Sequence, residues 1–168
     1  MMILDKEYFS QPATVLAPDL IGKILCRRTD EGVIRARITE TECYYGESDT
    51  ACHAHKGKTE RTGVMYQSGG VTYVYLCYGM HSLLNIVTGP ENHPEAVLIR
   101  GIDVAKGPGR TTKFLQITTK DNRLPLTVDS GIWIEDDGTK HEFSALPRVG
   151  IDYASDEDRE RPWRYLIK

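Results

Sequence analysis

The sequence predicts one α+β domain over residues 1–168, on the basis of its turn pattern and its hydrophobic periodicity. Several short runs alternate apolar and polar residues, and glycine-containing turns join them, as in antiparallel hairpins. The helical signals are short and lie between these runs. A chain of this length can bury a proper core without a second domain.

The first half of the chain predicts a helix, a hairpin and a loop. Ser10 opens the helix with Pro12 in its first turn, and Pro18 interrupts it. The next elements are, in order, a segment over 20–26 that leads into a strand, the hairpin partner of that strand over 33–42, and a polar loop over 46–63. The loop is long enough to be functional rather than a mere connection.

The second half predicts more strands and two short helices. Gly107-Pro108-Gly109 is typical of a tight turn, here before a helix that runs through Phe114. Ser155 precedes three acidic residues, which is typical of a helix start. The expected strands are a pair within 71–88, a strand over 95–101, and a hairpin of 131–135 with 140–143 across Asp136-Asp137-Gly138.

Two carboxylates occupy unexpected positions in the strand that begins at residue 33. Ile34, Ala36 and Ile38 share one face, and the same period puts Glu40 and Glu42 on that apolar face. Carboxylates are almost never fully buried without partners. They can lie past the core edge, pair with arginines, bind a metal or do chemistry. We expect a structural salt bridge for one and a catalytic role for the other.

A second alternating run, residues 73–85, contains three tyrosines and one glycine just after the third. The Tyr78-Gly79 step is a plausible bend, which puts Tyr78 at the tip of a protruding hairpin. A large aromatic side chain at an exposed tip normally needs a partner to cover its apolar area. For Tyr73 and Cys77 we expect ordinary core positions instead.

The net charge of −3 is unevenly distributed. Residues 121–168 hold 7 Lys+Arg against 11 Asp+Glu, whereas residues 1–120 hold 14 against 13. The charge neither proves nor excludes binding to DNA, and it predicts weak non-specific affinity, although some basic residues could still form a local phosphate-binding face. Its candidate members are Lys23, Arg27, Arg28, Lys56, Lys58, Arg61, Arg110 and Lys113.

The apolar runs and the spacing of the cysteines indicate where in the cell the protein is expected. No apolar run reaches membrane-spanning length, and the N-terminus lacks a signal-peptide profile. The four cysteines show no CxxC spacing, which fits reduced thiols better than a disulfide framework. We therefore expect a cytoplasmic protein with no membrane partner.

Several chemistries compete for the polar residues. Cys52-His53-Ala54-His55 beside Glu40 and Glu42 suggests zinc, but this spacing is not an established zinc motif. Two carboxylates suggest a glycoside hydrolase, although such pairs usually come from different elements. The glycine turn at 107–109 lacks the Lys-Ser/Thr of a P-loop.

A further interpretation is that the protein extracts one base from a DNA duplex. This task needs a carboxylate base, aromatic walls, a wedge, an amide and a cation. Residues that supply these are Glu42, Tyr44, His53, Tyr75, Tyr78, Asn85 and Arg100.

The motifs then allow a comparison. Thr39-Glu40-Thr41-Glu42-Cys43-Tyr44-Tyr45-Gly46 with Ala51-Cys52-His53 resembles the ETEAY…AAH region of the alkyladenine (3-methyladenine) DNA glycosylase family. Tyr73-Val74-Tyr75-Leu76-Cys77-Tyr78-Gly79-Met80, with Asn85 in step, is similar to that family's YVYxxYGM…N hairpin. The segments 97–100, 107–110, 147–151 and 161–165 recur in the expected order. The similarity covers nearly the whole chain, and the lack of a long N-terminal extension resembles bacterial members.

The resemblance implies a role for each matching residue. Glu42 would activate the water that attacks the anomeric carbon, and Arg100 would help to position that water. Asn85 would repel the amino group of guanine, and Tyr78 would wedge into the duplex together with Met80. The flipped purine would be held by Tyr44, His53, Tyr75, Ala51, Leu83 and Leu98. For Met80 and Leu98 a packing role is the simpler alternative.

The resemblance also implies the fold and the partners. The fold is a curved antiparallel sheet with surrounding helices and a protruding β-hairpin. The expected enzyme is a monofunctional glycosylase that acts as a monomer on double-stranded DNA with damaged purines, without a metal or other cofactor. Cys43, Leu83 and His81 depart from common family residues and could change which bases fit. Two rivals remain: a metal-dependent hydrolase using Glu40, Glu42, His53 and His55, and a non-catalytic DNA-damage binder.

Overall fold

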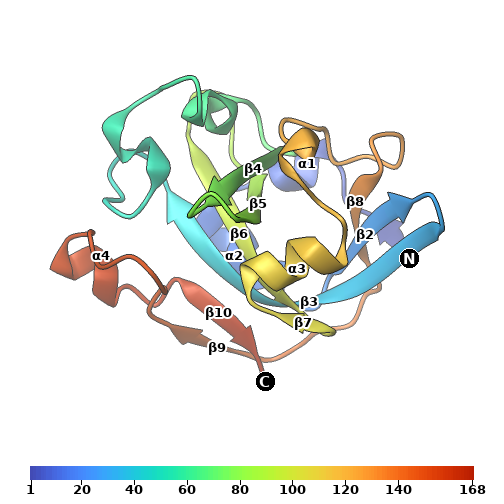
Figure 1. The fold of residues 1–168 in the computed structure, drawn as a ribbon. Coiled ribbons are helices and arrows are strands. Elements are labelled where there is room, and N and C mark those ends of the chain that lie inside the picture. Colours follow the sequence, from blue (N-terminus) through green and yellow to red (C-terminus); the bar gives the residue numbers. More distant parts are fainter.

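The computed structural model describes all residues from 1 to 168 and has an α+β architecture around one mostly antiparallel sheet (Figure 1). Its central path runs in the order β1-β8-β2-β3-β6-β5-β4, and β7, β9 and β10 attach beside it. The strands are β1 (Met2–Ile3), β2 (Ile24–Thr29), β3 (Gly32–Tyr45), β4 (Thr72–Cys77), β5 (His81–Val87), β6 (Glu95–Ile102), β7 (Ala105–Lys106), β8 (Ile132–Asp136), β9 (Phe143–Leu146) and β10 (Arg164–Ile167).

Helices are few and short. They are α1 (Lys6–Phe9), α2 (Ala13–Asp19), α3 (Pro108–Phe114) and α4 (Asp156–Glu160), with 3-10 turns η1 (His53–Lys56), η2 (Thr62–Tyr66) and η3 (Thr119–Asp121). In Figure 1, α2 lies behind the β3–β6 part of the sheet and α3 lies in front of it. None of the helices has both the length and the apolar character that crossing a lipid bilayer requires.

The start of α2 differs from the predicted helix start at Ser10. The helix begins at Ala13 after Pro12, which offers no side-chain cap. Glu95 supplies the missing acceptor from far along the chain, because its Oε1 accepts the Ala13 N–H at 2.7 Å. Pro18 lies inside the last turn, and the helix ends one residue later. The separate helix α1 was not predicted.

The long strand β3 organises the sheet. Its first half pairs with β2, as predicted across the turn at 30–32, and its second half lies between β6 and β10. Glu42 is opposite Leu98 on one side and Arg164 on the other. A side chain at this position is enclosed by strands on both edges, which explains how a carboxylate comes to be buried.

The prediction that Glu40 and Glu42 share the apolar face of β3 is wrong. The β3–β6 ladder is irregular between Ile38 and Thr41, so the alternation changes face there. Thr41 then points to the core and donates its hydroxyl to Ala17 O at 2.6 Å. The strands approach closely at Gly101, where a Cβ atom would lie 3.1 Å from Thr39 Oγ1. Both glutamates therefore lie on the face opposite the main core.

The predicted hairpin of 131–135 with 140–143 is also wrong. Strand β8 already has β1 and β2 as its two neighbours, so neither of its edges is free for a third strand. After β8 the chain makes local bonds, with Asp137 accepting from Thr139 and Arg37. It then continues to β9, which pairs with β10 instead.

The other predicted strands and helices are confirmed in type. Strands β4 and β5 form an antiparallel hairpin, β6 covers the predicted 95–101, and α3 follows the glycine turn. Ser155 caps α4 by accepting the Asp158 N–H at 3.2 Å. Within the predicted polar loop 46–63 lies η1, and η2 begins there and extends past it.

Candidate active site

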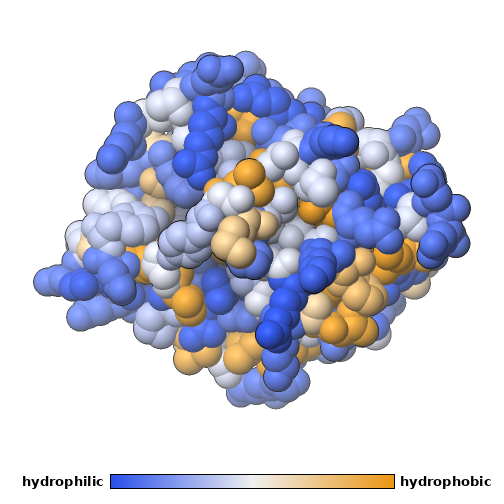
Figure 2. Space-filling model, in the orientation of Figure 1, coloured by the Kyte–Doolittle hydropathy of each residue, from blue (hydrophilic) through white to orange (hydrophobic).

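A cavity of about 1010 Å³ lies beside the β4–β5 hairpin, between the ends of β3 to β6, α3 and the segment that follows β9. Its lining includes most of the predicted site residues: Tyr44, His53, Tyr75, Tyr78, Leu83, Asn85, Leu98 and Arg100. The sheet curves so that residues from separate strands converge here. Figure 2 shows the same side of the molecule as Figure 1, with apolar residues (orange) near the middle and also at the lower right and lower edge, among hydrophilic residues (blue).

Glu42 is fully buried directly behind this cavity. Its Oε1 accepts the Tyr44 hydroxyl at 2.8 Å, and its Oε2 accepts the Val149 N–H at 2.7 Å. Arg100 Nε lies 3.9 Å from the same Oε2. Burial raises the pKa of Glu42, while Arg100, the Val149 N–H and Tyr44 oppose that rise. A carboxylate with a raised pKa beside a cavity has the character of a proton acceptor.

Glu40 has a different environment. Arg164 donates to its Oε2 at 3.0 Å, and Arg100 does so at 3.4 Å. The pair of arginines matches the expected salt bridge for one of the two glutamates. Arg100 is therefore shared, since it lies between Glu40 and Glu42.

Aromatic rings form one wall of the cavity. The His53 and Tyr75 ring centroids are 4.6 Å apart, and those of Tyr73 and Tyr75 are 5.2 Å apart. His53 Nδ1 makes a hydrogen bond with the Tyr73 hydroxyl at 2.9 Å. Burial, and secondarily the charge of Arg61, lowers the pKa of His53 to about 4. The imidazole is thus neutral near pH 7, and these rings carry no charge. They are inclined to one another, by 61° between His53 and Tyr75 and by 40° between Tyr73 and Tyr75. Tyr73 lines the cavity too, in addition to its expected core packing.

The floor of the cavity comes from β5 and β6. Leu83 and Asn85 lie on one face of β5, as the alternation predicted, and Leu98 is opposite Asn85 on β6. Asn85 is buried and donates its Nδ2–H to the Tyr73 carbonyl at 3.2 Å. That bond orients the amide within an otherwise apolar floor.

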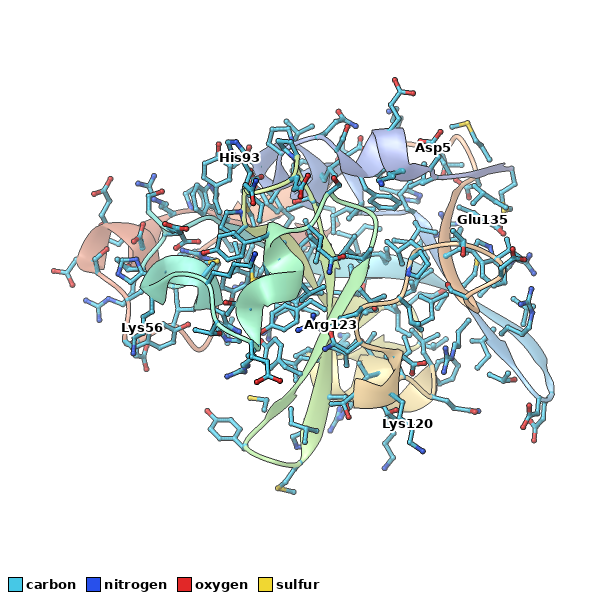
Figure 3. All side chains as sticks on the ribbon, turned by 90° about the horizontal axis from the view of Figure 1, so that it is seen from above. Asp5, Lys56, His93, Lys120, Arg123 and Glu135 are labelled. Atoms are coloured by element: carbon cyan, nitrogen blue, oxygen red, sulfur yellow. The ribbon has the colours of Figure 1, made fainter.

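The β4–β5 turn carries Tyr78 and Met80, whose exposed fractions are 91% and 76%. Tyr78 and Gly79 have positive φ values of 54° and 66°, and the Met80 N–H donates to Cys77 O at 3.1 Å. The strand register pairs Cys77 with His81, so the turn consists of the three residues 78–80. A tyrosine with a positive φ is uncommon. In Figure 3 this green turn lies at the opposite edge of the view from His93 and Asp5.

Comparisons with known proteins identify the family of the chain. A model of the methylpurine-DNA glycosylase family matches residues 7–106 and 102–168. The chain belongs to this family. A candidate 3-methyladenine DNA glycosylase of Psychrobacter cryohalolentis is 45% identical, covering 98% of this chain and 91% of that protein. Proteins of the same name from Borreliella burgdorferi and Methanocella arvoryzae are 39% and 38% identical, with 98% and 100% of this chain covered and 96% and 94% of theirs.

Besides Glu42, which lies behind the cavity, two predicted site residues of this methylpurine-DNA glycosylase family member do not line it. Ala51 is buried against Ile151 and Ala154, and its carbonyl accepts the Tyr153 hydroxyl at 2.7 Å. Met80 lies on the turn, outside the lining. Their predicted contacts with base and DNA stay predictions.

The four residues of the metal-dependent rival have other partners. Glu40 pairs with arginines, Glu42 binds Tyr44 and Val149, and His53 binds Tyr73. His55 Nδ1 makes a hydrogen bond with the Glu47 carbonyl at 2.7 Å. These side chains do not converge on one point, and no group of three His, Cys, Asp or Glu residues has the arrangement of a metal site.

Sequence reasoning missed the residues that the C-terminal part brings to the site. Arg148 is fully buried, forms an ion pair with Asp49 at 2.7 Å, and lies 5.0 Å from the Tyr44 ring centroid. The next residue, Val149, binds Glu42 and lines the cavity with Tyr153. The 147–151 motif was recognised from the sequence, but nothing in it indicated a contact with Glu42.

The predicted phosphate-binding face is only partly assembled. Arg61, Arg110 and Lys113 line the cavity, together with Lys106, which was not predicted. Three other members of that set point elsewhere: Lys23 pairs with Asp19 and Asp136, Arg27 with Asp121, and Arg28 lies over Trp133. The basic rim of the cavity is therefore smaller than the sequence suggested.

Proposed function

We propose that this protein removes damaged purines of the 3-methyladenine, hypoxanthine and ethenoadenine class from double-stranded DNA and leaves an abasic site. The observation that carries the proposal is the buried Glu42 carboxylate, held by Tyr44 and Val149 beside an aromatic cavity. Family membership and the names of the relatives agree with such an activity. Residues of one chain line the whole cavity, and we propose that the protein acts as a monomer.

Glu42 is the proposed general base. In the step, Glu42 takes a proton from water while the water oxygen bonds to the anomeric carbon. The bond from that carbon to the purine nitrogen breaks, and the purine leaves with the electron pair. A purine that is already cationic, or protonated, leaves most easily. Arg100 supports this role because it lies 3.9 Å from Glu42 and favours the ionised carboxylate.

Tyr44, His53 and Tyr75 are the proposed stacking surfaces for the extruded purine. A base taken out of a duplex loses its stacking partners, and aromatic side chains can replace them. A neutral His53 supports this role, since it presents a flat ring without a charge. Asn85, on the floor of the same cavity, would then contact the edge of the stacked purine.

The β4–β5 hairpin is the proposed DNA wedge. We propose that it protrudes into the minor groove and that Tyr78 fills the gap left by the flipped nucleotide, with Met80 beside it. The 91% exposure of Tyr78 supports this, because an apolar ring on a turn has no partner within the protein. Arg110 and Lys113, at the rim of the cavity, are the proposed phosphate contacts.

The deciding test is abasic-site formation on duplexes that carry one damaged purine each. We expect release by the native protein and a loss of about 10²–10⁴-fold in Glu42→Gln. Lesion-duplex affinity should stay within a few-fold, because the amide keeps the shape of the carboxylate. Glu40→Gln is the matched control and should reduce the rate much less. Binding without release by the native protein would make it a damage-binding protein instead.

A further inference from the structure

The cavity is lined by positive charge alone. Its lining contains five basic residues and no Asp or Glu: Arg61, Arg100, Lys106, Arg110 and Lys113. Glu42 and Glu40 lie behind the lining, and Arg100 is paired with both. Arg61, in contrast, forms no ion pair with any carboxylate. Its charge therefore acts on the cavity without a counter-charge of its own.

Arg61 lies over the ring of Tyr75, which belongs to the aromatic wall of the cavity. Its guanidinium carbon is 5.0 Å from the Tyr75 ring centroid, within the range of a cation–π interaction. A purine that stacks on Tyr75 either shares the ring with this guanidinium or displaces it within the same cavity. In both cases a positive charge on the purine lies close to a like charge. A neutral purine meets no such repulsion.

The neighbouring histidine shows that the field of Arg61 reaches the stacking surface. His53 is 4.6 Å from Tyr75 between ring centroids. The charge of Arg61 helps burial to lower the pKa of His53 to about 4. A field that disfavours a proton on this ring also disfavours a cationic ring stacked beside it.

We propose that Arg61 is a specificity-determining residue that disfavours purines with a fixed positive charge and favours neutral damaged purines. This inference rests on the proposed function, because it concerns which base occupies the same cavity. Neutral members of the class include hypoxanthine and ethenoadenine. Cationic members include the 3-methyladenine and 7-methylguanine nucleotides of methylated DNA.

The experiment compares two release rates for each protein. Single-turnover rate constants are measured for 3-methyladenine in methylated DNA and for hypoxanthine in a defined duplex. For Arg61→Gln we expect the ratio of cationic to neutral release to rise about 3- to 10-fold, since Arg61 is exposed and water screens its charge. The increase should shrink as salt concentration rises. Arg61→Lys keeps the charge and should keep a ratio near that of the native protein.

Arg110→Gln is the matched control, since Arg110 lines the same cavity but lies over no ring. It should lower both rates in the same proportion. A proportional change in Arg61→Gln, or an Arg61→Lys ratio equal to that of Arg61→Gln, overturns the inference.

Binding separates this inference from the proposed function. In a Glu42→Gln background, the affinities for a 7-methylguanine duplex and a hypoxanthine duplex are compared with and without Arg61→Gln. The affinity ratio should shift in the same direction as the rates. If the native protein releases no base, the proposed function fails while this ratio still tests the role of Arg61. An unchanged ratio overturns that role.

Discussion

Val149 donates its backbone N–H to Oε2 of Glu42 at 2.7 Å, although the two residues are 107 positions apart. Arg148, the preceding residue, holds this segment in place, because its buried guanidinium bonds to Asp49 and also to the Cys43 carbonyl at 2.9 Å. A hydrogen bond to a carboxylate favours its ionised form. The C-terminal part of the chain thus orients the carboxylate of Glu42, the proposed base, and limits the rise in its pKa that burial causes.

The first prediction concerns the pH dependence of excision. Burial raises the pKa of Glu42 above that of a free glutamate, and the base acts only when ionised. The rate on a permanently cationic lesion, which needs no protonation, should therefore fall as pH drops through a value above 4.5. Single-turnover rates between pH 8 and the acid limit of folding would measure this. The groups that face Glu42 are Arg100, Tyr44, Arg148 and the Val149 N–H.

Glu42→Gln is the control for this profile. Its residual rate should lose the acidic limb, since no carboxylate is left to titrate. The same limb in the variant would assign the titration to another group and contradict the role of Glu42.

The second prediction separates stability from activity at Tyr78. Asparagine adopts positive φ more readily than tyrosine, and a strained backbone costs about 1–3 kcal/mol. The free energy of unfolding of Tyr78→Asn, measured in urea, should therefore equal or slightly exceed that of the native protein. Excision of well-paired hypoxanthine should fall in both Tyr78→Asn and Tyr78→Ala, because neither side chain fills the stack. Full activity of either variant would leave the hairpin with a structural role only.

The third prediction concerns guanine, which differs from hypoxanthine only by its two-amino group. Asn85 is the polar residue on a floor formed with Leu83 and Leu98. A buried amino group without a partner costs on the order of 1–3 kcal/mol. Asn85→Ser and Asn85→Ala should raise guanine release from a mismatch with thymine, while hypoxanthine release stays level or falls. Abasic-site yield measures both, and no gain on guanine would exclude Asn85 as the gate.

The fourth prediction is a pH dependence of stability that arises from His53. Its pKa falls from 6.5 to about 4 on folding, so the unfolded chain binds the proton first as pH decreases. The contribution of neutral His53 to the free energy of unfolding is complete above pH 6.5, and it is lost as the pH falls from 6.5 to about 4. By pH 5 the loss should reach up to about 2 kcal/mol. Urea unfolding at pH 7.5 and pH 5 would show it.

His53→Gln should reduce this loss, and His55→Gln, at an exposed position, is the matched control. An equal loss in His53→Gln and the native protein would show that other groups cause the acid sensitivity.

Local sequence was sufficient for the elements whose partners are close in the chain. The β2–β3 and β4–β5 hairpins follow from alternation and from their turns, and Ser155 with its acidic neighbours predicts α4. The motifs also identified the residues that gather at the cavity, although their roles stay predictions. These features depend on periodicity and turn chemistry, which act over a few residues.

The tertiary structure alone decided the partners of β8, the face of Glu42 and the contacts of Val149. Strand β8 pairs with β1 and β2 rather than with the segment that follows it, because both of its edges are occupied. An irregular ladder between β3 and β6 moves Glu42 away from the apolar face predicted by strict alternation. These outcomes depend on which distant strands pair with a given strand edge and on how closely two backbones approach. A local sequence pattern contains no information on either.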